Sequence, residues 1–343
     1  MLLTMTDPAG PGPGNGAKTP TIAEVASLAG VSIATVSRVV SSAGRVRDAT
    51  RLRVEQAIAA TGWSANPAAR LLAGGRGDEV VLALAVASPQ EFAGDPYYAR
   101  VIAGAQAEAA ELGLSLSVHV TQVGSVPALL PFGRKRQHVG AVLVNVDPWE
   151  AAAVRDLGWP VISLGATAPD LPSVDPENET GAAGAAGHLL ARGRRRIATI
   201  AGPDRNPCAR ERLAGYRSAV RAAGLPELVV STDFTRAAAA AATRRLLRTC
   251  PDLDAIFVAS DLMATAVIQV LAAAGRRVPG DVAVVGFDDS PPAMMTVPTL
   301  STVRVPVEEE AALAVRTLAC PAADRPLDQR LPTQFVPRAS SAA

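Results

Sequence analysis

Side chains suited to contact with DNA bases cluster in residues 32–38. An arginine can pair bidentately with guanine, and a small apolar group can meet the methyl group of thymine in the major groove. Hydroxyl groups beside them are natural donors to backbone phosphates. We therefore expect base contacts from Ile33, Ala34 and Arg38, and phosphate contacts from Ser32, Thr35 and Ser37.

These side chains need a helix that is held against a second one. Thr21 followed three residues later by Glu24 predicts a capping box that starts a first helix. Gly30 can take the left-handed conformation that ends this helix, and Ser32 can cap the next. The pattern predicts a helix-turn-helix, and an ordinary αα-hairpin is the alternative.

Charge is distributed unevenly along the 343 residues. The formal net charge is only +1, yet residues 18–77 carry eight basic and three acidic side chains. Residues 78–343 carry 25 basic and 28 acidic ones. A basic head on a mildly acidic body indicates that one end meets a polyanion.

The pattern changes after the head. From residue 78, continuous apolar strands alternate with helices, which predicts parallel sheets covered on both faces. This stretch is too long for one sheet of usual size, so we expect two lobes. The predicted fold is an all-α helix-turn-helix head plus an α/β core of two doubly wound parallel sheets. The expected segments are a disordered tail (1–17), the head (18–64), a hinge helix and linker (65–77), lobe 1 (about 78–173 and 304–325) and lobe 2 (about 174–303 and 326–338).

Two charged residues follow apolar strands of the second lobe. Arg212 begins a helix after a strand and a Gly-Pro loop, and Asp261 lies just past residues 255–259. Ligands of open parallel sheets lie at the carboxyl ends of the strands, where an arginine and an aspartate bind hydroxyl groups in complementary ways. The alternatives are a surface helix arginine and an aspartate that only caps a helix.

The chain resembles the LacI/GalR family of repressors. The match Thr-Ile-Ala-Glu-Val-Ala-x-x-Ala-Gly-Val-Ser-x-x-Thr-Val-Ser-Arg-Val runs from Thr21 to Val39 and continues in Asn66-Pro67-Ala-Ala-Arg-x-Leu72. The resemblance extends through Ser260-Asp261-Leu-Met-Ala and Gly286-Phe287-Asp-Asp. It implies a bacterial repressor that is a homodimer on a roughly palindromic operator. Its core would be similar to periplasmic sugar-binding proteins, with a sugar-like effector between the lobes.

The resemblance also implies roles in DNA binding. It assigns base reading to Ile33, Ala34 and Arg38, and Arg45 falls at a position that varies in the family. Asn66 is a good N-cap for a hinge helix of about two turns, which is marginal in water by itself. In the family this helix forms on operator DNA, and a leucine that matches Leu72 enters the minor groove. Alternatively, Leu72 covers the core domain.

For the effector, the resemblance implies contacts from residues of both lobes. The matching residues are Arg212, Asp261, Phe234, Tyr97 and Tyr98. Phe234 would stack on the ligand or be plain core, and the tyrosines would line the cleft or lie at the surface or dimer face. Residues 120–140 depart from the family, because glycines, prolines and three basic residues replace an acidic helix.

Other functions find less support. The three cysteines and three histidines are scattered, so we expect no disulfide framework, metal site or cofactor. The sequence contains no P-loop and no Gly-x-Gly-x-x-Gly or Gly-x-Ser-x-Gly motif. Nothing in it therefore predicts an enzyme on a doubly wound sheet. A periplasmic-type binding protein is the other alternative, but no basic and apolar leader is apparent. We therefore expect a cytoplasmic protein that is nucleoid-associated when bound to DNA and has no catalytic residues.

Overall fold

The computed structural model describes residues 20–40, 46–63, 77–125, 138–156, 158–165, 170–320 and 324–342. The chain divides into two compact units, with the boundary between Gly77 and Asp78. The expected disordered tail (1–17) and most of the expected hinge segment (65–77) lie outside the described residues.

The N-terminal unit is helical. Its helices are α1 (Ile22–Ala29), α2 (Ile33–Val40) and α3 (Asp48–Thr61). The capping box is confirmed, because the backbone N–H of Glu24 donates to Thr21 Oγ1 and that of Thr21 donates to the Glu24 carboxylate. Gly30 has a φ of 62°, and the chain bends by 101° between α1 and α2. This is the angle of a helix-turn-helix, packed on a small core around Val25, Val36 and Val54.

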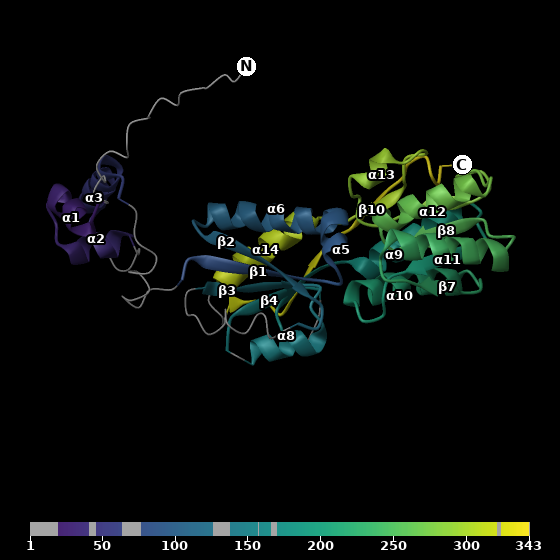
Figure 1. Cartoon of the computed structure of the whole chain (residues 1–343), viewed down its shortest axis with the longest axis horizontal. Helices are drawn as coiled ribbons and strands as arrows, with labels where there is room; N and C mark the ends of the chain where they lie inside the picture. Colours follow the sequence, from purple (N-terminus) through teal and green to yellow (C-terminus); the bar gives the residue numbers. More distant parts are fainter. Residues whose placement is uncertain are drawn as a thin grey trace, which may run out of the picture. The chain divides into compact units, whose positions relative to one another are not determined.

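The first lobe is built on a six-stranded parallel sheet (Figure 1). Its strands are β1 (Glu79–Val86), β2 (Ser115–Gln122), β3 (His138–Val144), β4 (Val161–Leu164), β5 (Ser173–Pro176) and β11 (Asp328–Leu331), in the order β11-β5-β4-β3-β1-β2. Alternate residues of β1 point to opposite faces. Val80 and Leu82 pack with α6 (Pro96–Glu111) and α14 (Val307–Ala319), whereas Val81 packs with α8 (Pro148–Arg155).

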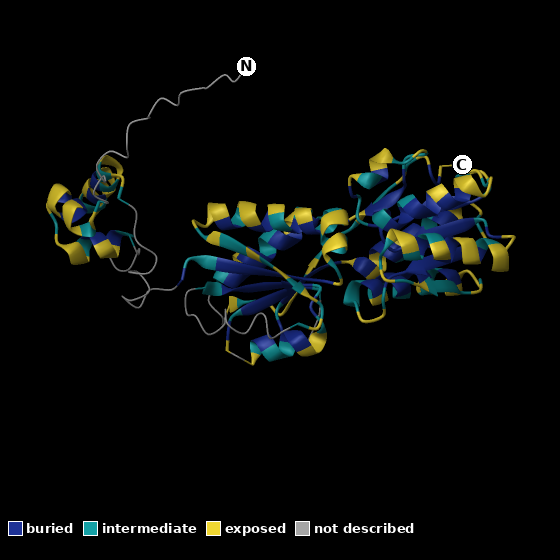
Figure 2. Ribbon diagram, in the orientation of Figure 1, coloured by how far each residue is buried: buried dark blue, intermediate teal, exposed yellow. Residues whose placement is uncertain are grey.

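The second lobe has a four-stranded parallel sheet. Its strands are β6 (Ile197–Ala201), β7 (Leu228–Ser231), β8 (Ala255–Val258) and β9 (Ala283–Val285), in the order β7-β6-β8-β9. Helices α9 (Asn178–Ala191) and α10 (Pro207–Ala222) cover one face, and α11 (Arg236–Thr249) and α12 (Asp261–Ala273) cover the other. Figure 2 shows buried strands between helices whose outer faces are exposed, as expected for doubly wound sheets.

Short elements complete the core unit: α5 (Pro89–Gly94), α13 (Pro292–Met295), β10 (Thr302–Arg304) and β12 (Gln334–Val336). Strands β10 and β12 pair antiparallel and contact α9 of the second lobe. The described chain therefore passes between the lobes at three places: from β5 to α9, from β10 to α14 and from β11 to β12.

The lobe boundaries differ from those expected. We expected 174–303 and 326–338 in the second lobe, but β5 and β11 pair with each other in the first sheet. Strand β11 reads Asp-Gln-Arg-Leu and is not buried, so no apolar run marks it. The sheet that β11 joins depends on the strand with which it pairs, here β5. The composition of a segment does not reveal its partner strand.

Among the described residues, no single helix has the length and apolar character needed to cross a membrane, although α1 and α2 taken together meet that test on length and composition alone.

Candidate ligand cavity and nucleic-acid interface

Helix α2 presents one exposed face. Val36 and Val39 are buried in the small core, while the side chain of Ile33 is 50% exposed. An isoleucine held half in water at the start of a helix is available to an apolar partner. The other exposed residues on this face are Ser32, Ala34, Ser37 and Arg38.

Two of the predicted phosphate donors also shape the helix. The backbone N–H of Thr35 donates to Ser32 Oγ at 3.2 Å, so Ser32 caps α2 as expected. The two hydroxyl groups lie 2.9 Å apart, and Thr35 is half-buried. The remaining predicted DNA contacts, Arg45, Asn66 and Leu72, lie outside the described residues and stay predictions.

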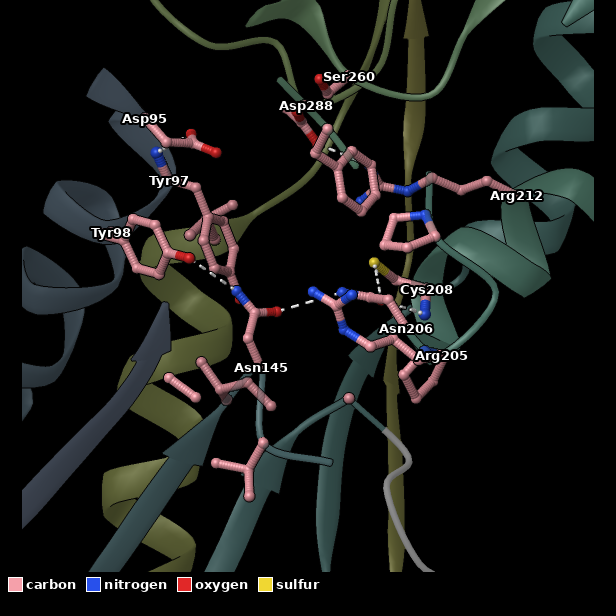
Figure 3. Close-up of a pocket in the computed structure, with 18 of the residues that line it drawn as sticks. Asp95, Tyr97, Tyr98, Asn145, Arg205, Asn206, Cys208, Arg212, Ser260 and Asp288 are labelled. Carbon is pink, nitrogen blue, oxygen red and sulfur yellow. Dashed lines mark hydrogen bonds and ion pairs between the residues drawn. The ribbon is translucent and has the colours of Figure 1, made fainter. Parts of the chain in front are cut away.

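A cavity lies between the two lobes of the core unit. Side chains from α6 and from the end of β3 line one side, and residues from α10 and its preceding loop line the other (Figure 3). Four of the five residues expected at the effector line this cavity: Tyr97, Tyr98, Arg212 and Phe234. The fifth, Asp261, is not among its lining residues.

Arg212 is 7% exposed and lies at the centre of a buried network. Its Nε donates to Asn178 Oδ1 at 2.9 Å, and its Nη1 donates to the carbonyl oxygen of Ala259 at 2.7 Å. The same Nη1 lies 3.0 Å from Asp288 Oδ1. The guanidinium carbon lies 3.9 Å from the centre of the Phe287 ring. With these partners, the guanidinium is held in one orientation at the cavity wall.

Asp288 also lines the cavity, although the sequence predicted no role for it in ligand binding. Its φ is 114°, a conformation that L residues rarely adopt and that is common where function demands it. Burial raises the pKa of its carboxyl group, and the guanidinium of Arg212 opposes part of that rise. Asp288 follows β9. Because ligands lie at the carboxyl ends of parallel strands, the rule that selected Asp261 also applies to Asp288.

Asp261 instead makes hydrogen bonds that connect neighbouring segments. Its side chain is fully buried, and it accepts hydrogen bonds from the backbone N–H of Ser290 at 2.8 Å and from Thr302 Oγ1 at 2.6 Å. It lies in the first turn of α12, whose N-cap is Ser260. These contacts join α12 to β10. Asp261 therefore has a structural role, although its neighbour Ser260 lines the cavity.

The aromatic side chains come from both lobes. Tyr98 is 2% exposed, and its hydroxyl donates to Glu91 Oε1 at 2.9 Å. Tyr97 packs edge-on against it, with 5.6 Å between the ring centres. Phe234 has a φ of 66° and lies so close to Gly202 that a Cβ there would be 2.3 Å from Phe234 Cζ. The glycine therefore makes room for the ring.

A chain of amides crosses the cavity. Asn145, at the end of β3, donates from Nδ2 to the Tyr98 hydroxyl at 3.2 Å. Asn206, the N-cap of α10, donates from Nδ2 to Asn145 Oδ1 at 3.3 Å (Figure 3). Beside them, Arg205 Nε lies 4.0 Å from Asp147 Oδ1. None of these four residues was singled out in the sequence, although Asn145 and Asp147 follow a strand and Asn206 precedes a proline.

Two carboxyl groups that line the same cavity, the half-buried Asp95 and the buried Glu310, have raised pKa values. Burial raises the pKa of Asp95 to about 6, despite the N–H of Tyr97 that donates to it. Burial and the neighbouring Asp175 raise the pKa of Glu310 to about 8. Within the described ranges, no group of three or more His, Cys, Asp or Glu residues is arranged to hold a metal ion. The arrangement suits hydrogen bonding to a polar ligand.

Comparison with known families finds one match within each of the two units. Residues 21–66 match the model for bacterial regulatory proteins of the lacI family. Residues 186–341 match the model for a periplasmic binding protein-like domain.

Individual relatives match over most of the chain. The HTH-type transcriptional regulator CelR of Thermobifida fusca is 40% identical over 299 residues, which cover 84% of this chain and 88% of the relative. A solved structure of a transcriptional regulator CelR–cellobiose complex has a TM-score of 0.73 at 35% identity and covers 94% of this chain and 99% of its own. The structure of the lac repressor dimer bound to operator and an anti-inducer has a TM-score of 0.78 at 28% identity. It covers 95% of this chain and 100% of its own.

Proposed function

Because the chain belongs to the lacI family of bacterial regulatory proteins and is a DNA-binding transcriptional regulator, we propose that it is a repressor whose operator affinity is set by a sugar bound between its lobes. The observation that carries the proposal is the ion pair between the buried Arg212 and the half-buried Asp288, in a cavity lined from both lobes. A rigid guanidinium and carboxylate offer donors and acceptors to neighbouring hydroxyl groups. The complex of CelR with cellobiose makes cellobiose the first ligand to test.

The exposed face of α2 supports the DNA-binding part of the proposal. Arg38 and the exposed Ile33 suit base edges, and hydroxyl groups beside them suit phosphates. We assign operator contacts to Ser32, Ile33, Ala34, Thr35, Ser37 and Arg38.

Regulation follows from where the cavity lies. A ligand that contacts both lobes favours one relative position of them, and the three crossings carry that change through the core unit. The affinities for effector and DNA are then linked reciprocally, typically by about 1–3 kcal/mol. As in the lac repressor dimer on its operator, two copies would place two heads on a roughly palindromic site in the cytoplasm. This function requires no catalysis, cofactor or metal.

The test is fluorescence anisotropy with the DNA upstream of the gene, titrated with salt and then with cellobiose. We expect salt-sensitive specific binding that cellobiose shifts. Arg212→Ala should abolish the shift, whereas Arg221→Ala, an exposed position on the same helix, should leave it unchanged.

Two results would contradict the proposal. Absence of specific binding to the upstream DNA would remove the regulatory role assigned to this chain. A full cellobiose response in Arg212→Ala would show that the effector binds elsewhere.

A further inference from the structure

Glu310 is a buried carboxyl group in the cavity. It lies in the first turn of α14, is 3% exposed and lines the space between the lobes. Within the part of the chain that the structure describes, its side chain makes no hydrogen bond or ion pair. By contrast, the carboxylate of Glu308 in the same turn accepts hydrogen bonds from Nε and Nη2 of Arg100, each at 2.7 Å.

A carboxyl group enclosed in a cavity and held by no protein partner is costly to ionise, because burial takes it away from bulk water. Burial and the neighbouring Asp175 raise the pKa of Glu310 to about 8, so at neutral pH it is mainly the protonated acid. In that form it offers one O–H donor and one carbonyl acceptor. Such a group is retained at a cost to stability when it serves a ligand.

The charges around the cavity narrow the class of ligand. Seven carboxyl groups and two guanidinium groups belong to its described lining residues. Both guanidinium groups already face acids, since Arg212 contacts Asp288 at 3.0 Å and Arg205 lies 4.0 Å from Asp147. A phosphate or carboxylate on the ligand would therefore meet mainly like charge, whereas hydroxyl groups would find both donors and acceptors.

We propose that Glu310 binds a hydroxyl group of the effector directly, and that the cavity selects an unphosphorylated saccharide over a sugar phosphate. The proposal rests on the proposed function, in which this cavity is the effector site.

The test compares Glu310→Leu and Glu310→Gln with Glu309→Leu, the exposed neighbour on the same helix. Calorimetric titrations use cellobiose, glucose and glucose 6-phosphate, and thermal unfolding is measured without ligand. We expect Glu310→Leu to weaken binding of the neutral sugar by about tenfold or more, because a hydrogen bond to the ligand is lost. Glu310→Gln, which keeps a donor and an acceptor, should retain most of the affinity, and Glu309→Leu all of it.

Thermal unfolding gives a readout that does not depend on the ligand. Removing an unpartnered buried carboxyl group should raise the Tm of the free Glu310→Leu protein, whereas a merely structural glutamate would lower it on replacement. A lower Tm in both Glu310 variants would overturn the argument.

The titrations also separate this inference from the proposed function. Unchanged sugar affinity in Glu310→Leu, with operator release intact, would overturn the role of Glu310 and keep the regulator. Sugar binding that depends on Glu310 but leaves operator affinity unchanged would support the contact and contradict the regulation. Binding of glucose 6-phosphate at least as tight as that of the neutral sugars, or no binding of either neutral sugar, would overturn the ligand class.

Discussion

The side-chain amide of Asn206 donates to Oδ1 of Asn145 at 3.3 Å, and this bond joins the two lobes across the cavity. Asn145 lies in lobe 1 after β3, with a left-handed φ of 56°, while Asn206 caps α10 in lobe 2. Asn145 also donates to Tyr98, so its amide orientation is set from both sides. This hydrogen bond next to the ligand cavity therefore depends on the relative position of the two lobes.

Asn206→Asp should weaken sugar binding while leaving α10 capped. Aspartate keeps the acceptor for the N–H groups of Cys208 and Ala209 but cannot donate to Asn145. The loss of one hydrogen bond is worth about 1 kcal/mol, or roughly fivefold in affinity. Calorimetric titration with cellobiose checks this. Asn145→Gly, which suits the positive φ but also removes the bond to Tyr98, should give at least the same loss, and unchanged affinity in both variants would contradict a role for the bond.

Gly202→Ala should displace Phe234 from the cavity wall. The new Cβ would lie 2.3 Å from Phe234 Cζ, so the ring must move. We expect weaker sugar binding, and little further loss when Phe234→Ala is added, since neighbouring changes are not additive. Gly187→Ala on α9, where nothing lies within 4 Å, is the matched control and should leave binding unchanged. Fully additive losses would show that the two positions act independently.

Arg38→Ala should reduce affinity for the operator more than for DNA of scrambled sequence. A bidentate arginine–guanine pair contributes about 1–3 kcal/mol of discrimination. Arg38→Lys keeps the charge and should lose discrimination while retaining nonspecific binding. Anisotropy titrations on both DNAs measure the ratio. Equal loss on operator and scrambled DNA would instead assign Arg38 to a phosphate.

Stability should fall as the pH rises through neutrality. The pKa of Glu310 is raised from 4.5 to about 8 in the folded protein, so the folded state binds more protons than the unfolded state in this window. The free energy of unfolding then decreases with pH between these two values. Asp95, raised from 3.8 to about 6, adds to the lower part of the window. Denaturant unfolding from pH 5 to pH 9 measures the slope.

Glu310→Gln supplies the control for that slope. Without the titrating group, the decrease between about pH 6 and pH 8 should become shallower, while the decrease due to Asp95 below about pH 6 should remain. An identical profile in the variant would assign the slope to other groups.

Local signals in the sequence predicted local structure well. The capping box of Thr21 and Glu24, the left-handed Gly30 and the apolar strands all appear as expected, because each depends on neighbours a few residues away. The edge strand β11 and its place in the first sheet were missed, since its pairing with β5 joins distant segments.

The cavity shows the same division. Periodicity and capping are properties of consecutive residues, so they were enough to predict the head and the parallel sheets. Arg212 was expected to begin a helix, whereas it lies within α10 and its guanidinium reaches the carbonyl oxygen of Ala259 after β8. Tertiary structure decided that Asp288 rather than Asp261 faces Arg212, that Asn145 meets Asn206, and that Glu310 is buried without a partner. These relationships depend on a backbone angle and on the approach of two lobes, and side chains from segments far apart in the chain meet only once it has folded.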